Sequence, residues 1–401
     1  MRTRTLLQLA ALTTISCSIW PNSLENVHPF LTFDGGLNDS SITSAAQTIQ
    51  YVWGGHAPRV WHAANNDTVI SAYMTFNRDP DASHSLMWWQ ENHPSWVLYQ
   101  CDRTTPARVD PADTNIALDV SNPDVVEWQV AIAASFGMEG FDAIAADNYS
   151  PYNYEKACGV WRAGAVWVNL YNDTLISDPI YETAMLAWLN FFRIGLHSLS
   201  TPLRLIPNFS IGDYYPFDSP TAIAVLNGVD GVLDERGFTG WGSGYISANE
   251  FANVLGWART LQAAGKAFYS INEWAQQQLN GTPPPPLPPR AVLEYVVASW
   301  LMVNDGFSGV FISCVQCYGW KEVAPQYLMQ VGSPTAPASN ATSVWTRTFS
   351  EGFAAVNLIG SPNANVSLPA GLFVNAYGDT FTGSVEIEGS AGIVLARVFN
   401  F

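Results

Sequence analysis

Basic residues are scarce in this sequence of 401 residues. It has 17 lysines and arginines against 34 aspartates and glutamates, which gives a net charge of −17. Proteins that bind nucleic acid or an anionic membrane surface use a basic face to do so. The charge balance therefore argues against both kinds of partner.

Several motifs of common sites are also missing. No phosphate-binding or dinucleotide-binding glycine motif follows a predicted strand, and there is no Gly-x-Ser-x-Gly nucleophile motif. Cys314 and Cys317 have the spacing of half a zinc site, but no second cysteine pair and no histidine cluster accompanies them. We therefore expect no metal and no cofactor.

Long apolar segments are absent beyond the start of the chain. Met1-Arg2-Thr3-Arg4 is followed by an apolar stretch to Ile15 and by the small residues Ser16-Cys17-Ser18. This order is typical of a secretory signal peptide, which we assign to residues 1–18. No later segment offers the ~20 apolar residues that cross a bilayer, so we expect a secreted protein with no membrane span in the mature chain. Acceptor sites for N-glycosylation agree with export: Asn38, Asn66, Asn172, Asn280, Asn340 and Asn365.

Four cysteines remain after removal of that segment, namely Cys101, Cys158, Cys314 and Cys317. An even number in an oxidising compartment predicts at least one disulfide. Two arrangements are open: a local bond between Cys314 and Cys317, or separate pairings of these residues to Cys101 and Cys158.

The composition predicts a well-packed globular chain, with 48% hydrophobic and 13% charged residues. Its length suits a barrel of about 250–300 residues and a smaller module. Short apolar segments alternate with helical ones, and eight of them are predicted strands: 30–33, 69–76, 96–99, 141–148, 203–208, 231–235, 266–273 and 309–313. This count predicts a (β/α)8 TIM barrel over residues 25–333.

From about residue 340 the pattern changes. Strand-like segments alternate with Gly, Asn and Pro, and no helical period is visible. The predicted strands are 346–349, 353–357, 366–369 and 393–396. They favour a small antiparallel, β-sandwich-like domain over residues 340–401.

Two of the predicted barrel strands end in carboxylates. One ends at Asp147-Asn148 and the other at Asp234-Glu235. An unpaired buried carboxylate costs several kcal/mol, so such residues are tolerated at the end of a strand rather than inside it. The C-terminal strand ends of a barrel form its active-site face, and two carboxylates from different strands are what glycosidic bond cleavage requires. The alternatives are solvated strand ends or a structural ion pair.

Several segments resemble the hypothetical glycosyl hydrolase family 15, a group of TIM-barrel proteins distinct from the glucoamylases. The segments are 73–80, 88–94, 99–103, 118–123, 147–148 and 234–238. The resemblance covers most of the barrel, and related barrel glycosidases have a nucleophile on strand four and an acid/base on strand six. It thus implies Asp147 as nucleophile and Glu235 as acid/base. Asp234 is the rival acid, because adjacent strand residues point to opposite faces.

Other polar and aromatic residues near predicted strand ends are candidates to bind sugar hydroxyls or stack on sugar rings. They are Asp34, Asn77, Arg78, Asp102, Arg103, Asn148, Asn208, Trp241, Asn272, Glu273 and Trp274. Glu273 is also a third candidate catalytic carboxylate, and loop capping is the alternative for Asp34. For His56, His62, His84 and His93 we expect structural roles.

These features together predict a secreted, monomeric glycoside hydrolase that acts on an oligo- or polysaccharide. A catalytically inactive, lectin-like barrel is the alternative, since it would keep the aromatic residues without needing a protonated acid. A third possibility is a structural or surface protein whose acidic residues keep it in solution.

Overall fold

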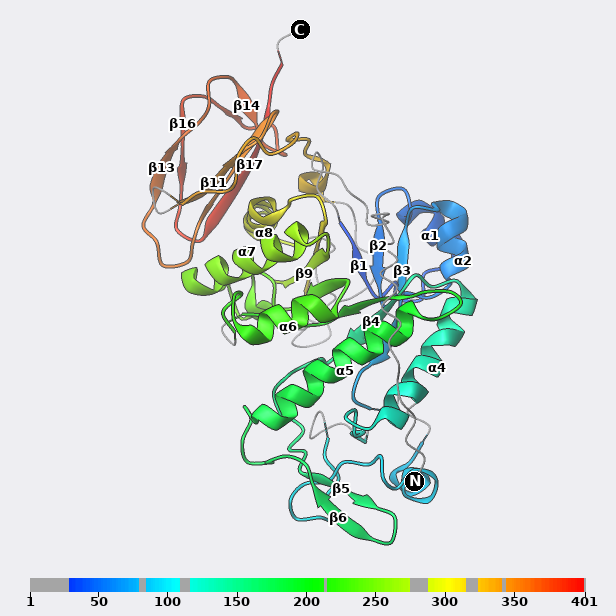
Figure 1. The fold of residues 1–401 in the computed structure, drawn as a ribbon. Helices are drawn as coiled ribbons and strands as arrows, with labels where there is room; N and C mark the ends of the chain where they lie inside the picture. The colour runs from blue at the N-terminus through cyan, green and yellow to red at the C-terminus, as the bar shows by residue number, and fades with distance from the viewer. Residues whose placement is uncertain are drawn as a thin grey trace, which may run out of the picture.

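A computed structural model describes residues 29–78, 84–108, 116–212, 215–274, 288–314, 324–340 and 344–399 (Figure 1). The predicted signal peptide, residues 1–18, and Cys317 lie outside these ranges.

Two parallel sheets make up the core of residues 29–314. The first has the order β1-β2-β3-β4-β7 and the second the order β10-β9-β8. The strands are β1 (Leu31–Thr32), β2 (Tyr51–Trp53), β3 (Val69–Thr75), β4 (Ala143–Asp147), β7 (Arg204–Pro207), β8 (Gly231–Asp234), β9 (Ala267–Glu273) and β10 (Ser308–Ser313). Isolated parallel bridges join Asn208 to Leu233 and Pro29 to Val310, one at each junction between the sheets. This mixed α/β arrangement is consistent with a TIM-type barrel.

Helices connect most of these strands. They are α1 (Asp39–Ala45), α2 (Pro58–Ala64), α3 (Leu86–Asn92), α4 (Pro123–Glu139), α5 (Pro179–His197), α6 (Pro220–Gly228), α7 (Ala248–Ala263) and α8 (Arg290–Val303), with 3-10 turns η1 (Gly240–Gly242) and η2 (Pro325–Leu328). The start of α4 follows from its sequence, because Asn122 caps the helix and Pro123 occupies its first turn. No helix in the described ranges is long and apolar enough to cross a membrane.

The predicted strand at 96–99 is wrong. Val97 and Tyr99 form only single-residue bridges, to Leu118, Pro106 and Gly159. Conversely, β2 was not predicted, because three residues before a Gly-Gly pair are too short to show a period. The strand predicted at 96–99 is absent and β2 is additional, so the predicted total of eight is unchanged. β4 and β8 are therefore the fourth and sixth parallel strands in chain order, as predicted.

Large side chains cross the interior between strands that are not neighbours in a sheet. Tyr51 of β2 stacks on Tyr269 of β9, with ring centroids 4.0 Å apart. The indole nitrogen of Trp53, also on β2, donates to the carbonyl of Ile206 on β7 at 3.2 Å. The interior is therefore a packed core, and function is left to the loops at the strand ends.

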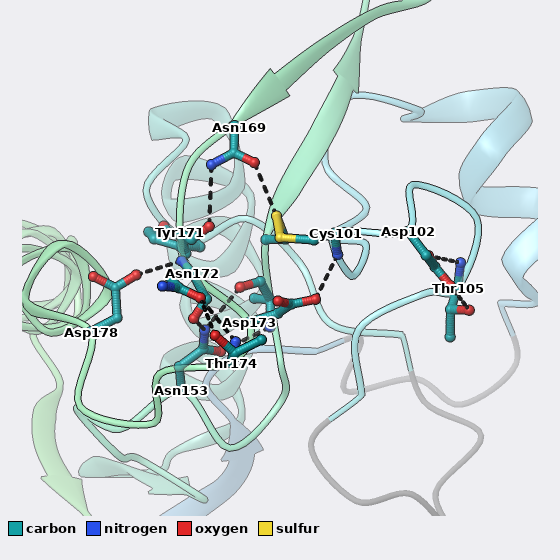
Figure 2. Close-up of a disulfide and its surroundings, with 12 residues drawn as sticks. Cys101, Asp102, Thr105, Asn153, Asn169, Tyr171, Asn172, Asp173, Thr174 and Asp178 are labelled. Atoms are coloured by element: carbon teal, nitrogen blue, oxygen red, sulfur yellow. Dashed lines mark hydrogen bonds between the residues drawn. A yellow bond between two sulfur atoms is a disulfide. The ribbon is translucent and has the colours of Figure 1, made fainter.

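A long connection between β4 and α5 carries the hairpin β5 (Gly159–Arg162) and β6 (Val166–Asn169). Cys158, the residue before this hairpin, forms a disulfide with Cys101 in the connection after β3 (Figure 2). The two cysteines are 57 residues apart in the sequence. The backbone amide of Cys101 also donates to Asp173 at 2.8 Å. The prediction of at least one disulfide is thus confirmed, and the alternative in which Cys101 and Cys158 pair separately with other cysteines is wrong.

An antiparallel β region follows the parallel core. Its five-stranded sheet contains β11 (Val344–Thr348), β12 (Gly352–Asn357), β17 (Ala391–Arg397), β14 (Phe373–Val374) and β15 (Thr380–Phe381), and a second pair contains β13 (Ala364–Ser367) and β16 (Ser384–Ile387). Figure 1 shows these strands beside α7 and α8, at the other end of the molecule from the β5–β6 hairpin. Gly392 allows β17 to approach α8, since a Cβ there would lie 2.7 Å from the Cα of Tyr295.

Candidate active site

Asp147 is the last residue of β4, and the chain turns away immediately after it. Asn148 adopts the left-handed region, with φ 60°, which asparagine tolerates better than most residues. The carboxylate of Asp147 receives the Tyr73 hydroxyl on Oδ2 at 2.7 Å and the backbone amide of Asn148 on Oδ1 at 2.8 Å. An ionised carboxylate can accept both of these hydrogen bonds and others besides.

Asn208 connects this carboxylate to a second one. Its Nδ2 donates to Asp147 Oδ1 at 3.0 Å and to Glu235 Oε2 at 2.8 Å. Asn208 and Glu235 directly follow β7 and β8, so the three residues come from neighbouring strand ends. Because both oxygens are bonded to one nitrogen at these distances, they lie at most 5.8 Å from each other.

Asp234 lies behind Glu235 rather than beside it. Its side chain is buried, and Oδ1 accepts from the backbone amides of Arg236 at 3.1 Å and Gly237 at 3.2 Å. Burial raises the pKa of this carboxyl to about 6. Gly237, at φ 47°, has no room for a side chain, since a Cβ would lie 2.1 Å from the carbonyl of Ile271. Asp234 therefore organises the tight turn that follows β8.

A cavity of about 360 Å³ lies against Glu235, a size found among small-molecule pockets. Its lining combines polar and aromatic residues: Asn148, Ser150, Glu155, Asn208, Ser210, Glu235, Tyr149, Pro151, Tyr152, Tyr154, Phe209, Tyr215 and Trp241. Tyr152 and Tyr215 stack with ring centroids 5.1 Å apart, which holds the loops after β4 and β7 together. Flat aromatic faces beside the Glu235 carboxyl group suit a sugar ring, and Asp147 is next to the lining residue Asn148.

Trp241 is one of two exposed aromatic residues of this lining, with 41% of its surface accessible against 47% for Tyr154. It sits in η1 with a left-handed backbone, φ 56°. The guanidinium carbon of Arg236 lies 5.2 Å from the centre of its ring, and Arg236 forms an ion pair with Glu250. A cation held against the ring fixes its orientation.

Glu155 is a lining residue that the sequence did not indicate. It is 5% exposed, accepts a hydrogen bond from Asn77 Nδ2 and lies beside the hydroxyl of Tyr181. Burial raises the pKa of this carboxyl to about 8. No sequence signal could have found it, because it lies in the loop after β4 rather than at a strand end.

Three candidates lie near the ends of β1 and β3. Asn77 is buried against Glu155. Arg78 forms a hydrogen bond with Tyr73. Burial and the charge of Asp147 raise the pKa of the Tyr73 phenol, and the charge and hydrogen bond of Arg78 oppose that rise. Asp34 is buried, with 3% of its surface exposed, and contacts His56 and Trp61. Arg78 is thus brought close to Asp147 through Tyr73.

The β9 candidates are outside the described cavity lining. Asn272 is fully buried, accepts from the Phe238 amide at 2.8 Å and donates to the Ser270 carbonyl at 3.1 Å. Glu273 is also buried, and Trp274 is half-buried, with its amide bonded to Ser313 at 3.0 Å. Asn272 instead anchors the loop after β8, which carries Trp241.

Asp102 lies beside the disulfide, next to Cys101 (Figure 2). Arg103 lies against the β5–β6 hairpin, at Trp167. Hydrogen bonds from Thr105 and Thr104 lower the pKa of exposed Asp102 to about 2. The Arg103 guanidinium lies 5.6 Å from the ring centre of Trp167. Residues 96–99, which precede Asp102 and Arg103, do not form a parallel core strand, and neither Asp102 nor Arg103 is in the cavity lining. The arginine beside Trp241 is Arg236. Within the described ranges no group of three or more His, Cys, Asp or Glu is arranged to hold a metal ion.

No family model and no curated protein matches this sequence. Solved structures similar to its fold include glycoside hydrolases. The glycoside hydrolase domain of PelA from Pseudomonas aeruginosa is 14% identical, with a TM-score of 0.46, over 74% of this chain and 99% of that one. A GH31 dextranase from Flavobacterium johnsoniae is 9% identical, with a TM-score of 0.49, over 94% and 52%. Ega3 of Aspergillus fumigatus, solved with galactosamine, is 10% identical, with a TM-score of 0.44, over 76% and 97%. The resemblance to hypothetical glycosyl hydrolase family 15 stays a prediction.

Proposed function

We propose that this protein is an exported glycoside hydrolase that cleaves O-glycosidic bonds with Asp147 and Glu235. The observation that carries the proposal is the Asn208 amide nitrogen, which donates to both carboxyl groups. It holds two acids from different strands close together at one end of the parallel core. Asp234, buried behind the turn, is not assigned a catalytic role.

The spacing favours a retaining mechanism. Retaining glycosidases have carboxyl groups about 5–5.5 Å apart, whereas inverting ones leave a wider gap for water. Asp147 attacks the anomeric carbon while Glu235 protonates the departing oxygen, and the glycosyl–enzyme bond is then hydrolysed by water that Glu235 deprotonates.

The proposed substrate is an oligo- or polysaccharide. Trp241 and the tyrosines of the cavity supply faces for stacking, and Asn148 supplies polar contacts beside the acids. We further propose that the eight parallel strands close into a (β/α)8 barrel, residues 25–333, followed by a C-terminal β domain, residues 340–401. The two isolated bridges between the sheets support closure.

The aromatic lining also supports a second candidate, a lectin-like barrel that binds glycans without cleaving them. The test is a hydrolysis screen of the purified protein against α- and β-linked oligo- and polysaccharides, with products read by mass spectrometry. We expect Asp147→Asn and Glu235→Gln to abolish most turnover while affinity stays within roughly tenfold, about 1.4 kcal/mol. Asp102→Asn, which changes an exposed carboxylate near the disulfide, is the matched control and should retain full rate.

Unchanged turnover in Asp147→Asn would contradict the mechanism. Glycan binding by the wild type with no product across the whole panel would favour the lectin.

A further inference from the structure

Three histidine–aspartate pairs occur in the part of the chain that the structure describes. His62 and His197 pair with Asp142 and Asp230, at 3.0 and 2.8 Å. Both of these aspartates precede a parallel strand, and they also accept the backbone amides of neighbouring strands, at 2.9 and 3.0 Å. They belong to the N-terminal strand ends, the face of such folds associated with stability.

The third pair, His56 with Asp34, lies at the opposite end. Asp34 follows β1 and His56 follows β2, so both are at the C-terminal strand ends, as are Asp147 and Glu235. No stability argument requires an exposed imidazole there, and functional residues concentrate on this face.

Asp34 fixes the orientation of the His56 ring. The aspartate side chain is 4% exposed and accepts the His56 backbone amide at 2.9 Å, the Trp61 indole at 3.2 Å and the His56 Nδ1. Because the carboxylate accepts from Nδ1, that nitrogen carries the proton and Nε2 of the neutral ring is an acceptor. The His56 side chain is 46% exposed, and its Nε2 has no partner among the described residues.

A short chain of contacts links this pair to the acids. Phe33, next to Asp34, packs on Tyr73 with ring centroids 5.3 Å apart, and the Tyr73 hydroxyl donates to Asp147. Trp53, three residues before His56, donates to the Ile206 carbonyl, two residues before Asn208. His56 is therefore on the β1–β2 side of the acid pair, while the aromatic cavity lies over the loops after β4, β7 and β8.

We propose that His56 is a substrate-binding residue whose Nε2 accepts a hydrogen bond from a sugar hydroxyl, and that Asp34 is its positioning residue. This inference rests on the proposed function and extends it. The substrate would contact the protein on both sides of the acid pair, so it would be longer than a single sugar unit. His56, which the sequence suggested to be structural, thereby gains a role in binding.

The decisive variant is His56→Asn. An asparagine amide can still donate to Asp34 in place of Nδ1 but presents nothing where Nε2 was. His56→Gln places an acceptor near the Nε2 position and serves as the rescue. His62→Asn is the control for replacing a paired histidine, because His62 contacts an aspartate through Nε2 at the far end of the strands.

The kinetic test uses the oligosaccharide that the wild type cleaves fastest in the hydrolysis screen, and the binding test measures its affinity for each variant in the Asp147→Asn background. We expect His56→Asn to lower kcat/KM about three- to tenfold, mainly through KM, as for one lost hydrogen bond. His56→Gln should recover part of this loss, and His62→Asn should keep the wild-type KM. Melting temperatures of His56→Asn and the wild type should agree.

Equal KM and affinity in His56→Asn and His62→Asn would overturn the inference and leave the proposed function intact. A wild type that neither binds nor cleaves any glycan of the panel would overturn both. If the wild type binds a glycan without cleaving it, the proposed hydrolase activity is contradicted. The role of His56 is then tested by affinity alone, and a loss of affinity in His56→Asn supports it.

Discussion

Asp147 and Glu235 accept hydrogen bonds from one nitrogen atom, the side-chain amide of Asn208, at 3.0 and 2.8 Å. Because one nitrogen donates to both, the two carboxyl groups are held close together at the ends of β4 and β8.

Removing the shared donor should impair catalysis more than binding. We expect Asn208→Ala to lower kcat roughly 10- to 100-fold, because the acids lose their fixed separation and the acid loses its orientation. The measurement is kcat and KM on the substrate found in the screen. Asn169→Ala, near the disulfide, is the control, and equal kcat values for the two variants would contradict this role.

Trp241 should contribute to substrate affinity but not to the chemical step. Trp241→Ala removes an exposed platform, so we expect KM to rise about tenfold with little change in kcat or in melting temperature. The control is Phe191→Ala, which truncates an aromatic residue of α5 that is 61% exposed and outside the described cavity lining. An unchanged KM would remove Trp241 from the substrate site.

Glu155 should make the protein less stable as the pH rises. The unfolded chain loses this proton near pH 4.5, whereas the folded protein holds it to about pH 8. The folded state therefore binds more protons between these values, and the free energy of unfolding falls across that window. Glu155→Gln cannot ionise, so it should match the wild type near pH 4 and be more stable at pH 8.

Urea denaturation at both pH values measures this difference. Exposed Glu139→Gln, at the end of α4, is the control and should follow the wild type throughout. Buried Asp234, with its pKa raised to about 6, acts in the same direction, so a weaker decline should remain in Glu155→Gln. A wild type that gains stability from pH 5 to 8 relative to the variant would contradict the assignment.

The Cys101–Cys158 bond should stabilise the protein by restricting the unfolded chain. It closes a segment of 57 residues, for which the loss of chain entropy corresponds to about 4 kcal/mol. We expect the double variant Cys101→Ser, Cys158→Ser to unfold at clearly lower denaturant concentration. Equal stability of the variant and the wild type would contradict a stabilising effect of the bond on the folded state relative to the unfolded chain.

Local patterns in the sequence predicted the elements whose signals are local. Asn122 and Pro123 mark the start of α4, and apolar runs that end in acid locate the ends of β4 and β8. The three residues of β2 were missed because a run that short has no period, and residues 96–99 were assigned to a strand because an apolar run resembles one even when only single bridges form. Such a run cannot reveal whether neighbouring strands will complete its ladder.

By itself, therefore, the sequence determined the parallel-strand architecture and the pair of strand ends that carry Asp147 and Glu235, because burial of apolar runs and exposure of charge are properties of each segment. Only the tertiary structure decided that Asn208 joins these acids, that Asp234 turns inward, that Glu155 lines the cavity and that Asp34 orients His56. Each of these depends on which loops meet across the strand ends. That meeting follows from strand order and from the packing of side chains far apart in sequence.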